Sequence, residues 1–579
     1  MDRLANSKYP TVAAINGTCA GGGLEVALAC TARVASSSKR TAMSLPEVML
    51  GLLPGAGGTQ RLPALLGLRA SLDIALTGKS IRPDKARKLK LVDVVADPNA
   101  LEDAAILVAR QLADKKISFK RERSLVDKIL EHNSYTRNFV YNQAKATIAK
   151  QTNGNYPAPP AILEAIKTGL EKGRTAGLAK EAEGFGALGM TPESKALVSL
   201  FFGKTALKKN RFGKPSRKSE TVAVIGAGLM GAGIAQVSAE KAGMNVILKD
   251  RDNAGLARGE QQIFKNLDTK VKRKSMSALE RDVIMSRVTG ITNTDSFGDN
   301  YLRKADMVIE AVFEDIGVKH KVIQELERLV PEHCVIASNT SALPIADIAA
   351  GSKRPENVVG MHYFSPVDKM ELLEVITTSK TSKEASAAAV EVGIRQGKVV
   401  IVVKDGPGFY TTRILSPFMV EAGGLLQEGH GIADVDKAMR KFGFPVGPVT
   451  LFDEVGIDVG NHIQPTLNKA FGVRMSGANS DMMVEMVNRK WAGRKTGKGF
   501  FVYEGKKKSI NPEIEELLKK YQGAPTKLSV EELQNRVAYR MINEALYCLQ
   551  DGTLENPTDG DLGAVFGYAY SFVCLLLCC

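Results

Sequence analysis

Short apolar runs alternate with amphipathic stretches of helical length between Thr221 and about Lys404. Runs such as TVAVI and NVILK have the length and β-branched content of buried strands. This alternation predicts βαβ units on a parallel sheet. Beyond Gly406 the apolar spacing becomes helical and stays so through about Gly499. We therefore expect an α/β domain followed by a helical one.

The first part of the chain has a different pattern. Tyr9 to Ile15 predicts a strand, and a glycine run then opens an apolar helix from Leu24 to Thr31. Helices separated by turns follow to about Lys116, and residues 121–210 are mostly helical. A chain of 579 residues has room for about three or four domains. The pattern thus predicts a multidomain α/β protein.

The helical C-terminal part contains an internal repeat. An arginine, a Glu-Ala pair and a Leu-Gln-acidic-Gly stretch occur twice with the same spacing. The two copies comprise Arg413, Glu421-Ala422 and residues 426–429, and then Arg536, Glu544-Ala545 and residues 549–552. The second copy ends after Phe566-Gly567, where the first continues as FPVGPVTLFDEVG. We expect two related helical units, of which the second is incomplete.

Composition and charge narrow the choice of function. The net charge of +15 and the hydrophobic share of 44% describe a basic but ordinary globular chain. No apolar run approaches the ~20 residues of a membrane helix, and no transit peptide is visible. The seven cysteines form no CxxC pair with histidine partners, so we expect neither a metal site nor a disulfide framework. Aromatic residues do not interleave with the basic ones, so we expect no nucleic-acid binding.

A glycine-rich turn follows the first strand of the α/β domain. In TVAVIGAGLMGAG the first glycine permits a tight turn, the second admits a pyrophosphate, and the third lets helix and strand pack closely. The residues expected at a dinucleotide are Gly226, Gly228, Leu229, Met230 and Gly231. The alternative is a glycine-rich turn of another α/β fold.

The next strand supports the dinucleotide interpretation. It ends in Asp250, at the position where a carboxylate holds the ribose diol of the adenosine. A carboxylate repels a 2′-phosphate, so we expect NAD rather than NADP as the cofactor. Arg251 is the counter-argument, since an arginine attracts that phosphate.

Three later segments carry candidates for alcohol oxidation, which needs a base and a partner that orients it. His362 follows the apolar run NVVGM, Glu374 lies in MELLEVI, and Ser341 closes CVIASNTS. We expect all three at the C-terminal ends of strands or in the segments just beyond them, where open α/β sheets build their sites. Taken singly, the histidine reads as a structural residue, the glutamate as a surface charge and the serine as a helix cap.

Together these segments resemble the 3-hydroxyacyl-CoA dehydrogenase family. The matching stretches are GAGLMGAGIAQ, EAVFED, SNTSALPI, GMHYFSPV and DGPGFYTTR. The resemblance implies that His362 is the general base, that Glu374 fixes its tautomer and stabilises the imidazolium, and that Ser341 contacts the substrate hydroxyl.

The resemblance also implies cofactor-side positions. Asn339 would lie by the nicotinamide and the substrate, and Glu314 and Lys319 would be further residues on the cofactor side. One departure concerns Thr412, which stands where many single-function members carry an active-site asparagine. A threonine hydroxyl still forms a hydrogen bond, with a shorter reach, on the substrate side.

The N-terminal stretch NGTCAGGGLEVALAC resembles the enoyl-CoA hydratase, or crotonase, superfamily. By this resemblance the N–H of Gly22 donates to the thioester oxyanion, and Glu25 and Glu47 share the acid and base roles of hydration. The family pattern includes an upstream segment that carries the second oxyanion donor. Because the first strand of this chain is the one just before Asn16, we expect its hydratase half to be incomplete.

The order of GGGLE, LPGAGGTQRLP, GAGLMGAGIAQ and GMHYFSPVDKM resembles the multifunctional fatty-acid oxidation α-subunits. From FGFPVG, ILKD and YTTR we expect the mitochondrial trifunctional form rather than the bacterial one, truncated at both ends. The resemblance implies β-oxidation of (long-chain) acyl-CoA thioesters, in which 2-enoyl-CoA is hydrated and 3-hydroxyacyl-CoA is oxidised to 3-ketoacyl-CoA. It also implies a thiolase β-subunit as partner and a location in the mitochondrial matrix, at the periphery of the inner membrane.

The expected fold class is α/β with five parts. They are a truncated crotonase domain (1–116), a helical linker (117–218), a Rossmann NAD-binding domain (219–404), a helical dehydrogenase domain (405–505) and a partial second helical copy (525–579). Two alternatives to a working dehydrogenase remain. One is a catalytically impaired scaffold subunit, against which the intact dehydrogenase residues argue. The other is a basic module that binds nucleic acid or a membrane surface.

Overall fold

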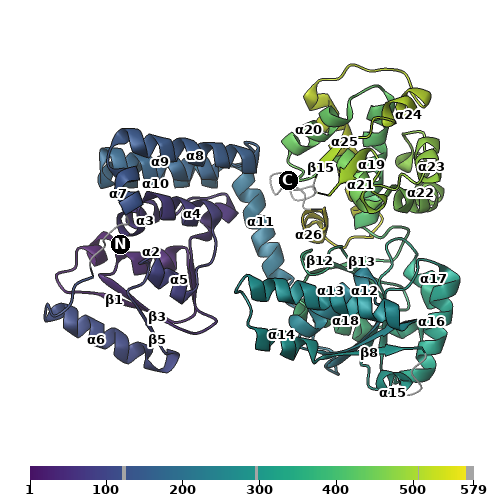
Figure 1. Ribbon diagram of the computed structural model, residues 1–579, viewed down its shortest axis with the longest axis horizontal. Coiled ribbons are helices and arrows are strands. Elements are labelled where there is room, and N and C mark those ends of the chain that lie inside the picture. Colours follow the sequence, from purple (N-terminus) through teal and green to yellow (C-terminus); the bar gives the residue numbers. More distant parts are fainter. Residues whose placement is uncertain (120–124, 294–297, 506, 569–579) are drawn as a thin grey trace. The chain divides into compact units, whose positions relative to one another are not determined.

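The computed structural model describes residues 1–119, 125–293, 298–505 and 507–568. They form two compact units, the N-terminal unit up to Phe201 and the C-terminal unit from Phe202 onward, coloured purple to blue and teal to yellow in Figure 1. Residues 120–124 of the predicted linker and residues 569–579 of the predicted second repeat lie outside the described residues.

Two small parallel sheets form the framework of the N-terminal unit. Their strands are β1 (Val12–Ile15), β3 (Ala32–Ser36) and β5 (Val94–Ala96) in one sheet, and β2 (Thr18–Ala20) and β4 (Ala42–Ser44) in the other. The helices up to the end of the predicted first domain are α1 (Asp2–Ala5), α2 (Gly22–Ala29), η1 (Pro46–Leu50), α3 (Gly58–Leu66), α4 (Leu68–Thr77), α5 (Pro83–Lys88), η2 (Pro98–Ala100) and α6 (Leu101–Ala113).

Two boundaries in this unit differ from the sequence prediction. The strand expected from Tyr9 begins at Val12, because a proline at position 10 offers no N–H to a ladder. The helix expected from Leu24 already begins at Gly22. Gly21 has a φ of 57°, which lets the chain turn directly into the helix.

The helices beyond residue 124 pack onto this unit instead of standing apart from it. They are α7 (Leu125–Glu131), α8 (Ser134–Thr152), α9 (Ala158–Lys172), α10 (Arg174–Gly189) and α11 (Pro192–Ala206). Tyr141, Ile162 and Ile166 share a buried core with Leu53 and Leu72. Figure 1 shows α8, α9 and α10 side by side against α3 and α4. The segment predicted as a linker therefore belongs, up to Phe201, to the N-terminal unit.

The C-terminal unit is built on an eight-stranded sheet with the order β13-β12-β11-β10-β9-β6-β7-β8. The strands are β6 (Thr221–Ile225), β7 (Asn245–Asp250), β8 (Val288–Thr292), β9 (Met307–Glu310), β10 (Val335–Ser338), β11 (Val358–Tyr363), β12 (Leu372–Thr377) and β13 (Val399–Lys404). The helices among them are α12 (Leu229–Glu240), α13 (Asn253–Lys272), α14 (Ala278–Met285), α15 (Gly298–Leu302), α16 (Ile316–Leu329), α17 (Ile345–Ala349), η3 (Pro355–Asn357) and α18 (Lys383–Arg395).

Both faces of this sheet are buried, as its continuous apolar runs predicted. Val222 and Val224 of β6 belong to one core, which α12, α13 and α18 cover, whereas Ala223 and Ile225 belong to another, on the side of α16. Successive side chains of a strand point to opposite faces, so one apolar run supplies both cores. The expected Rossmann fold is confirmed.

The sheet differs from the prediction at one edge. β12 runs antiparallel to β11 and parallel to β13, so these two strands oppose the other six. Only residues 364–371 connect β11 to β12, and a parallel neighbour needs a crossover of about a dozen residues or more. Glu374 therefore lies inside an antiparallel strand, and the expectation that it sits at or just beyond a C-terminal strand end is wrong.

The remainder of the C-terminal unit is helical apart from a hairpin of β14 (Phe501–Glu504) and β15 (Lys507–Ile510). Its helices are α19 (Thr411–Gln427), α20 (Ile432–Phe442), α21 (Pro448–Val455), α22 (Ile457–Phe471), η4 (Gly472–Met475), α23 (Asp481–Asn488), η5 (Arg494–Thr496), α24 (Ile514–Lys520), α25 (Val530–Gln550) and α26 (Pro557–Tyr568). Among the described residues, no helix has the length and apolar character needed to span a membrane.

The two copies of the sequence repeat form α19 and α25, which pack against each other. Their equivalent residues pair reciprocally. Arg413 of the first copy contacts Glu544 of the second, with Nε 2.7 Å from Oε1, and Arg536 of the second contacts Glu421 of the first, with Nη2 2.6 Å from Oε1. The repeat thus builds a nearly symmetric interface inside one chain.

Candidate active sites

The predicted base and its partner lie opposite each other on neighbouring strands. His362 of β11 and Glu374 of β12 are register partners, and Nδ1 of the histidine is 2.9 Å from Oε2 of the glutamate. His362 is 6% exposed, and Glu374 is fully buried. An ionised carboxylate only accepts hydrogen bonds, so this contact places a proton on Nδ1 and leaves Nε2 as the acceptor of a neutral ring.

Glu374 is held by the start of α19. Its Oε1 accepts the N–H groups of Tyr410 and Thr411 at 2.9 and 3.1 Å, and its Oε2 accepts the Thr411 hydroxyl at 2.7 Å. Three hydrogen bonds from the start of this helix thus fix the position and orientation of the carboxylate. The sequence prediction singled out Thr412 and missed Thr411. The only signal in the sequence that could have identified Thr411 is its position next to Thr412, in the first turn of a helix.

Thr412 contacts a different part of the site. Its hydroxyl donates to the carbonyl oxygen of Ser341 at 3.0 Å, and the N–H of Ser341 donates to Glu314 at 3.0 Å. The hydroxyl of Thr340 also donates to Glu314. The backbone of the predicted substrate-contacting serine is thus anchored from two sides, by α19 and by the loop after β9.

Asn339 and Lys319, the residues predicted on the cofactor side, form contacts within the protein. Oδ1 of Asn339 accepts the N–H of Tyr363, the residue after the predicted base, at 2.9 Å. The Lys319 ammonium is fully buried, with Nζ 2.9 Å from Glu310 and 3.4 Å from Glu314. Lys319 therefore forms ion pairs with these two glutamates. It could influence a bound cofactor only by holding Glu314 in place. Glu310, the last residue of β9, was missed because its ion-pair partner is visible only in the fold.

The glycine turn has the form that a dinucleotide requires. Gly226 has a φ of 99°, and a Cβ on Gly231 would lie 1.7 Å from the Gly226 carbonyl oxygen. Beside Gly228 the space is open, as an approaching pyrophosphate needs. Asp250 accepts the N–H of Ala227 at 2.7 Å, which aligns its carboxylate with the turn.

A hollow of about 230 Å³ lies beside this turn. Its lining consists of Ala227, Gly228, Leu229, Asp250, Gly255, Arg258 and Gln262. Leu229 is exposed, whereas Met230 is partly buried against the core. Arg258 and Gln262 were not predicted, although they lie one helical turn apart on α13. The open turn, the carboxylate and the hollow fit the adenosine and pyrophosphate of NAD.

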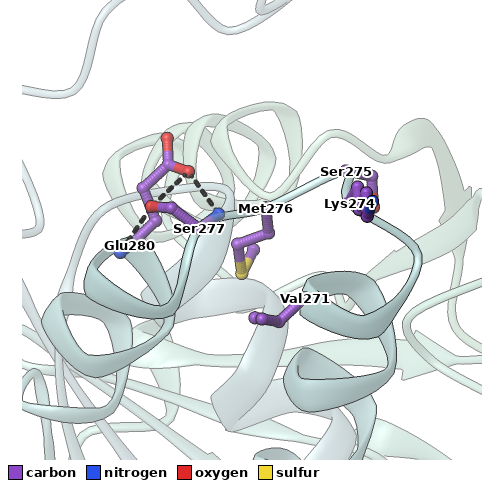
Figure 2. Close-up of a pocket in the computed structure, with 6 residues that line it drawn as sticks. All are labelled: Val271, Lys274, Ser275, Met276, Ser277 and Glu280. Carbon is purple, nitrogen blue, oxygen red and sulfur yellow. Dashed lines mark hydrogen bonds between the residues drawn. The ribbon is translucent and has the colours of Figure 1, made fainter.

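A second hollow of about 350 Å³ lies at the junction of α13 and α14 (Figure 2). The polar groups drawn there form a capping box in which the Ser277 hydroxyl and the Glu280 carboxylate bond each other's backbone N–H groups. Gly259 of α13 lies against Ala227 of the glycine turn, and α13 ends at Lys272, thirteen residues or roughly 20 Å further along the helix. The hollow is a helix junction remote from the glycine turn.

The residues predicted for hydration gather in the N-terminal unit. Glu25, 2% exposed, lies in the first turn of α2, and its Oε1 accepts the N–H groups of Ala56 and Gly58 at 2.8 and 2.7 Å. Glu47, in η1, points toward the same turn, since its Oε1 lies 3.1 Å from where a Cβ on Gly21 would stand. Gly22 begins α2 with open space beside it.

The two glutamates have different surroundings. Burial, together with smaller contributions from the nearby charges of Glu25 and Glu181, raises the pKa of Glu47 to about 7. Its buried Oε2 has no hydrogen-bond partner among the described residues. Glu25, in contrast, is fixed as an acceptor by two backbone N–H groups. Glu47 thus titrates near neutral pH, whereas Glu25 is oriented by its two hydrogen bonds.

A glycine turn that opens a Rossmann helix and a histidine–carboxylate pair on the same sheet define a dinucleotide-binding oxidoreductase. Comparison with known families agrees. Residues 221–406 match the 3-hydroxyacyl-CoA dehydrogenase NAD binding domain, residues 408–503 match the C-terminal domain of that family, and residues 1–153 match enoyl-CoA hydratase/isomerase.

Relatives with the same combination of domains cover almost the whole chain. The chain is 47% identical over 572 residues to the fatty acid oxidation complex subunit alpha of Shewanella amazonensis, which covers 98% of this chain and 80% of that protein. The Shewanella halifaxensis protein of the same description is 46% identical over 573 residues, with 98% and 79% covered. The chain therefore belongs to the family of fatty acid oxidation complex α-subunits.

A solved structure supports the dehydrogenase half. The 3-hydroxybutyryl-CoA dehydrogenase of Escherichia coli K12 is 27% identical, with a TM-score of 0.53, and covers 62% of this chain and 90% of its own. The relatives also correct one expectation. They come from Shewanella, a bacterium without mitochondria, so the predicted mitochondrial location is wrong. The mitochondrial form expected from FGFPVG, ILKD and YTTR is not supported by these bacterial relatives.

Proposed function

We propose that the C-terminal unit oxidises 3-hydroxyacyl-CoA to 3-ketoacyl-CoA with NAD, as a step of fatty-acid β-oxidation. The observation that carries this proposal is the His362–Glu374 contact of 2.9 Å, held from behind by the start of α19. A base with a fixed tautomer, at the end of a Rossmann sheet, is what the oxidation of a secondary alcohol requires.

In this proposal His362 removes the proton of the substrate hydroxyl through Nε2. The ring becomes an imidazolium, which the Glu374 carboxylate stabilises across the Nδ1 contact. NAD supplies the acceptor for the hydride that leaves C3 of the substrate. Ser341 is positioned by Thr412 and Glu314 to contact the hydroxyl or carbonyl oxygen during the reaction.

NAD would be held by the glycine turn and by Asp250. The Gly226 turn and the N-terminus of α12 would face the pyrophosphate, and the carboxylate would accept the ribose hydroxyls. Each carboxylate oxygen that already accepts a backbone N–H keeps a lone pair for this purpose. The negative charge of Asp250 supports NAD rather than NADP.

The test is formation of NADH from 3-hydroxyacyl-CoA and NAD, comparing the parent chain with His362→Ala. Removing the base should lower kcat by on the order of 10²–10⁴-fold. A well-folded parent chain that binds NAD without turning over substrate would contradict the dehydrogenase proposal. The non-catalytic scaffold would then be the better account.

We also propose a hydratase activity for the N-terminal unit. Glu25 would activate the water that attacks C3 of the enoyl thioester, Glu47 would give its proton to C2, and the Gly22 N–H would stabilise the thioester oxygen. The different surroundings of the two glutamates support this division of roles. Turnover of 2-enoyl-CoA that disappears in both Glu25→Gln and Glu47→Gln would support it.

The relatives are described as a subunit of a fatty acid oxidation complex, which supports a second subunit as partner. We propose a thiolase as that subunit, because the product 3-ketoacyl-CoA is the substrate of thiolytic cleavage. Peripheral membrane association remains part of this proposal. Pull-down of a co-expressed thiolase by this chain, compared with an unrelated acyl-CoA enzyme, tests the partner.

A further inference from the structure

Four consecutive backbone N–H groups at the start of α3 are shared alternately between two buried carboxylates. In residues 56–59 the first and third N–H groups donate to Glu25 at 2.8 and 2.7 Å, and the second and fourth donate to Glu181 at 2.5 and 3.0 Å. Neighbouring N–H groups of one turn thus connect Glu25 to a carboxylate that the proposed hydratase mechanism does not use.

Glu181 reaches this turn from α10, more than a hundred residues further along the chain. It is 2% exposed, and the Thr59 hydroxyl donates to it as well. A buried carboxylate is stable only when it is well solvated by the protein, and here two N–H groups, a hydroxyl and the N-terminus of α3 supply that solvation. The position of the charge and the shape of the turn therefore depend on each other.

The surrounding packing leaves this turn little freedom to move. A Cβ on Gly55 would lie 2.6 Å from the ring of Phe185, and one on Gly184 would lie 2.8 Å from Leu53. Arg61 donates to the carbonyl oxygen of Ala56 at 2.7 Å. These close contacts restrict the residues on either side of the turn. From α10, Glu181 accepts the two N–H groups of the turn that do not bond Glu25.

We propose that Glu181 is a positioning residue of the hydratase site, which fixes the turn of residues 56–59 and through it the orientation of Glu25. This inference rests on the hydratase part of the proposed function. Glu181 does not touch the substrate in this proposal and acts through the turn. Its charge has a second effect, because it helps to raise the pKa of Glu47.

The experiment compares the full-length parent with Glu181→Gln and Glu183→Gln. Glu183 lies on the same helix but is exposed, in an ion pair with Lys180, and serves as the matched control. A glutamine turns an NH₂ group toward N–H donors, so Glu181→Gln should loosen the turn. Amide hydrogen exchange of a peptide covering residues 54–62 should accelerate at least tenfold in Glu181→Gln and stay at the parent rate in Glu183→Gln.

Kinetic measurements distinguish a positioning role from a purely structural one. In Glu181→Gln we expect kcat for hydration to fall by roughly 10–100-fold with little change in KM, since misplaced catalytic groups lose rate rather than binding. The pKa of Glu47 should fall when the neighbouring charge is lost, so the loss of activity at high pH should begin at a lower pH.

Each outcome decides between the proposals. Exchange and kcat equal to those of the parent would overturn the positioning role of Glu181. A parent chain without hydratase turnover would refute the hydratase activity, and the exchange comparison would still decide whether Glu181 holds the turn. If Glu181→Gln does not fold, Thr59→Val removes only the hydroxyl donor, and a smaller acceleration of exchange at residues 54–62 supports the same role while parent-like exchange refutes it.

Discussion

Arg413 of α19 and Glu544 of α25 form an ion pair in which both side chains are 3% exposed and Nε lies 2.7 Å from Oε1. Arg413 follows Thr411 and Thr412, the two residues that contact Glu374 and Ser341. The second copy of the repeat therefore supports the helix start on which the predicted base and its partner depend.

We expect this pair to matter more than its symmetric counterpart. Glu544→Ala leaves a buried guanidinium with one partner fewer, and we expect the free energy of unfolding to fall by about 2–4 kcal/mol. Glu421→Ala removes the partner of the more exposed Arg536, with an expected loss of about 1 kcal/mol. Trp491, the single tryptophan, lies in the same helical region and reports urea unfolding by fluorescence. Equal losses of unfolding free energy in the two variants would contradict the greater importance of the Arg413–Glu544 pair.

Removal of the carboxylate beside the predicted base should be costly. Glu374→Gln keeps the shape but no longer fixes the proton on Nδ1 or stabilises the imidazolium, so kcat for 3-hydroxyacyl-CoA should fall on the order of 10²–10⁴-fold. Glu371→Gln, at a half-exposed position shortly before it in the chain, is the control and should keep the parent kcat. The prediction fails if both variants behave alike.

The two neighbouring threonines of α19 should have separable effects. Thr411→Val removes a hydrogen bond to a buried charge, worth about 1.5–3 kcal/mol, and kcat should fall roughly tenfold or more. Thr412→Val breaks a hydrogen bond to a neutral carbonyl, worth about 1 kcal/mol, and should have the smaller effect. Steady-state kinetics with varied 3-hydroxyacyl-CoA measure both. A larger fall in kcat for Thr412→Val would mean that the contact with Ser341 matters more than the contact with Glu374.

Cofactor choice should follow the charge at Asp250. Asp250→Asn keeps an acceptor for the Ala227 N–H but removes the repulsion of a 2′-phosphate, so discrimination against NADP should weaken by roughly tenfold. Arg251, 88% exposed, is the comparison, and Arg251→Gln should leave the preference for NAD unchanged. If Arg251→Gln instead abolishes residual use of NADP, then Arg251 and not Asp250 determines the response to the 2′-phosphate.

The hydratase reaction should lose activity as the pH rises through the pKa of Glu47. Burial raises the pKa of Glu47 to about 7, and hydration uses the protonated form. The kcat/KM for hydration should therefore fall as the pH rises above about 7. The kcat/KM for dehydration should fall with it, because the reaction takes up no net proton and the ratio of the two values is a pH-independent equilibrium constant. A kcat/KM for hydration that does not change as the pH rises through 7 would separate Glu47 from the proton transfer.

Local patterns in the sequence predicted the elements that depend on neighbouring residues. The glycine turn at Gly226 and the strand that carries His362 follow from motifs of a few residues. The contacts of Thr411 and Glu181 span 37 and 122 residues, and no local signal specifies them. The reversal of β12 escaped prediction because an apolar run has the same composition in either direction.

The split of one turn between Glu25 and Glu181 also orders events in time. Gly57 is made 124 residues before the carboxylate that accepts its N–H. At about 5–20 residues per second of synthesis, that interval is roughly 6–25 s. Until Glu181 emerges from the ribosome, the turn that holds Glu25 lacks half of its acceptors, so the N-terminal unit completes its site only after the helices beyond residue 124 have been synthesised.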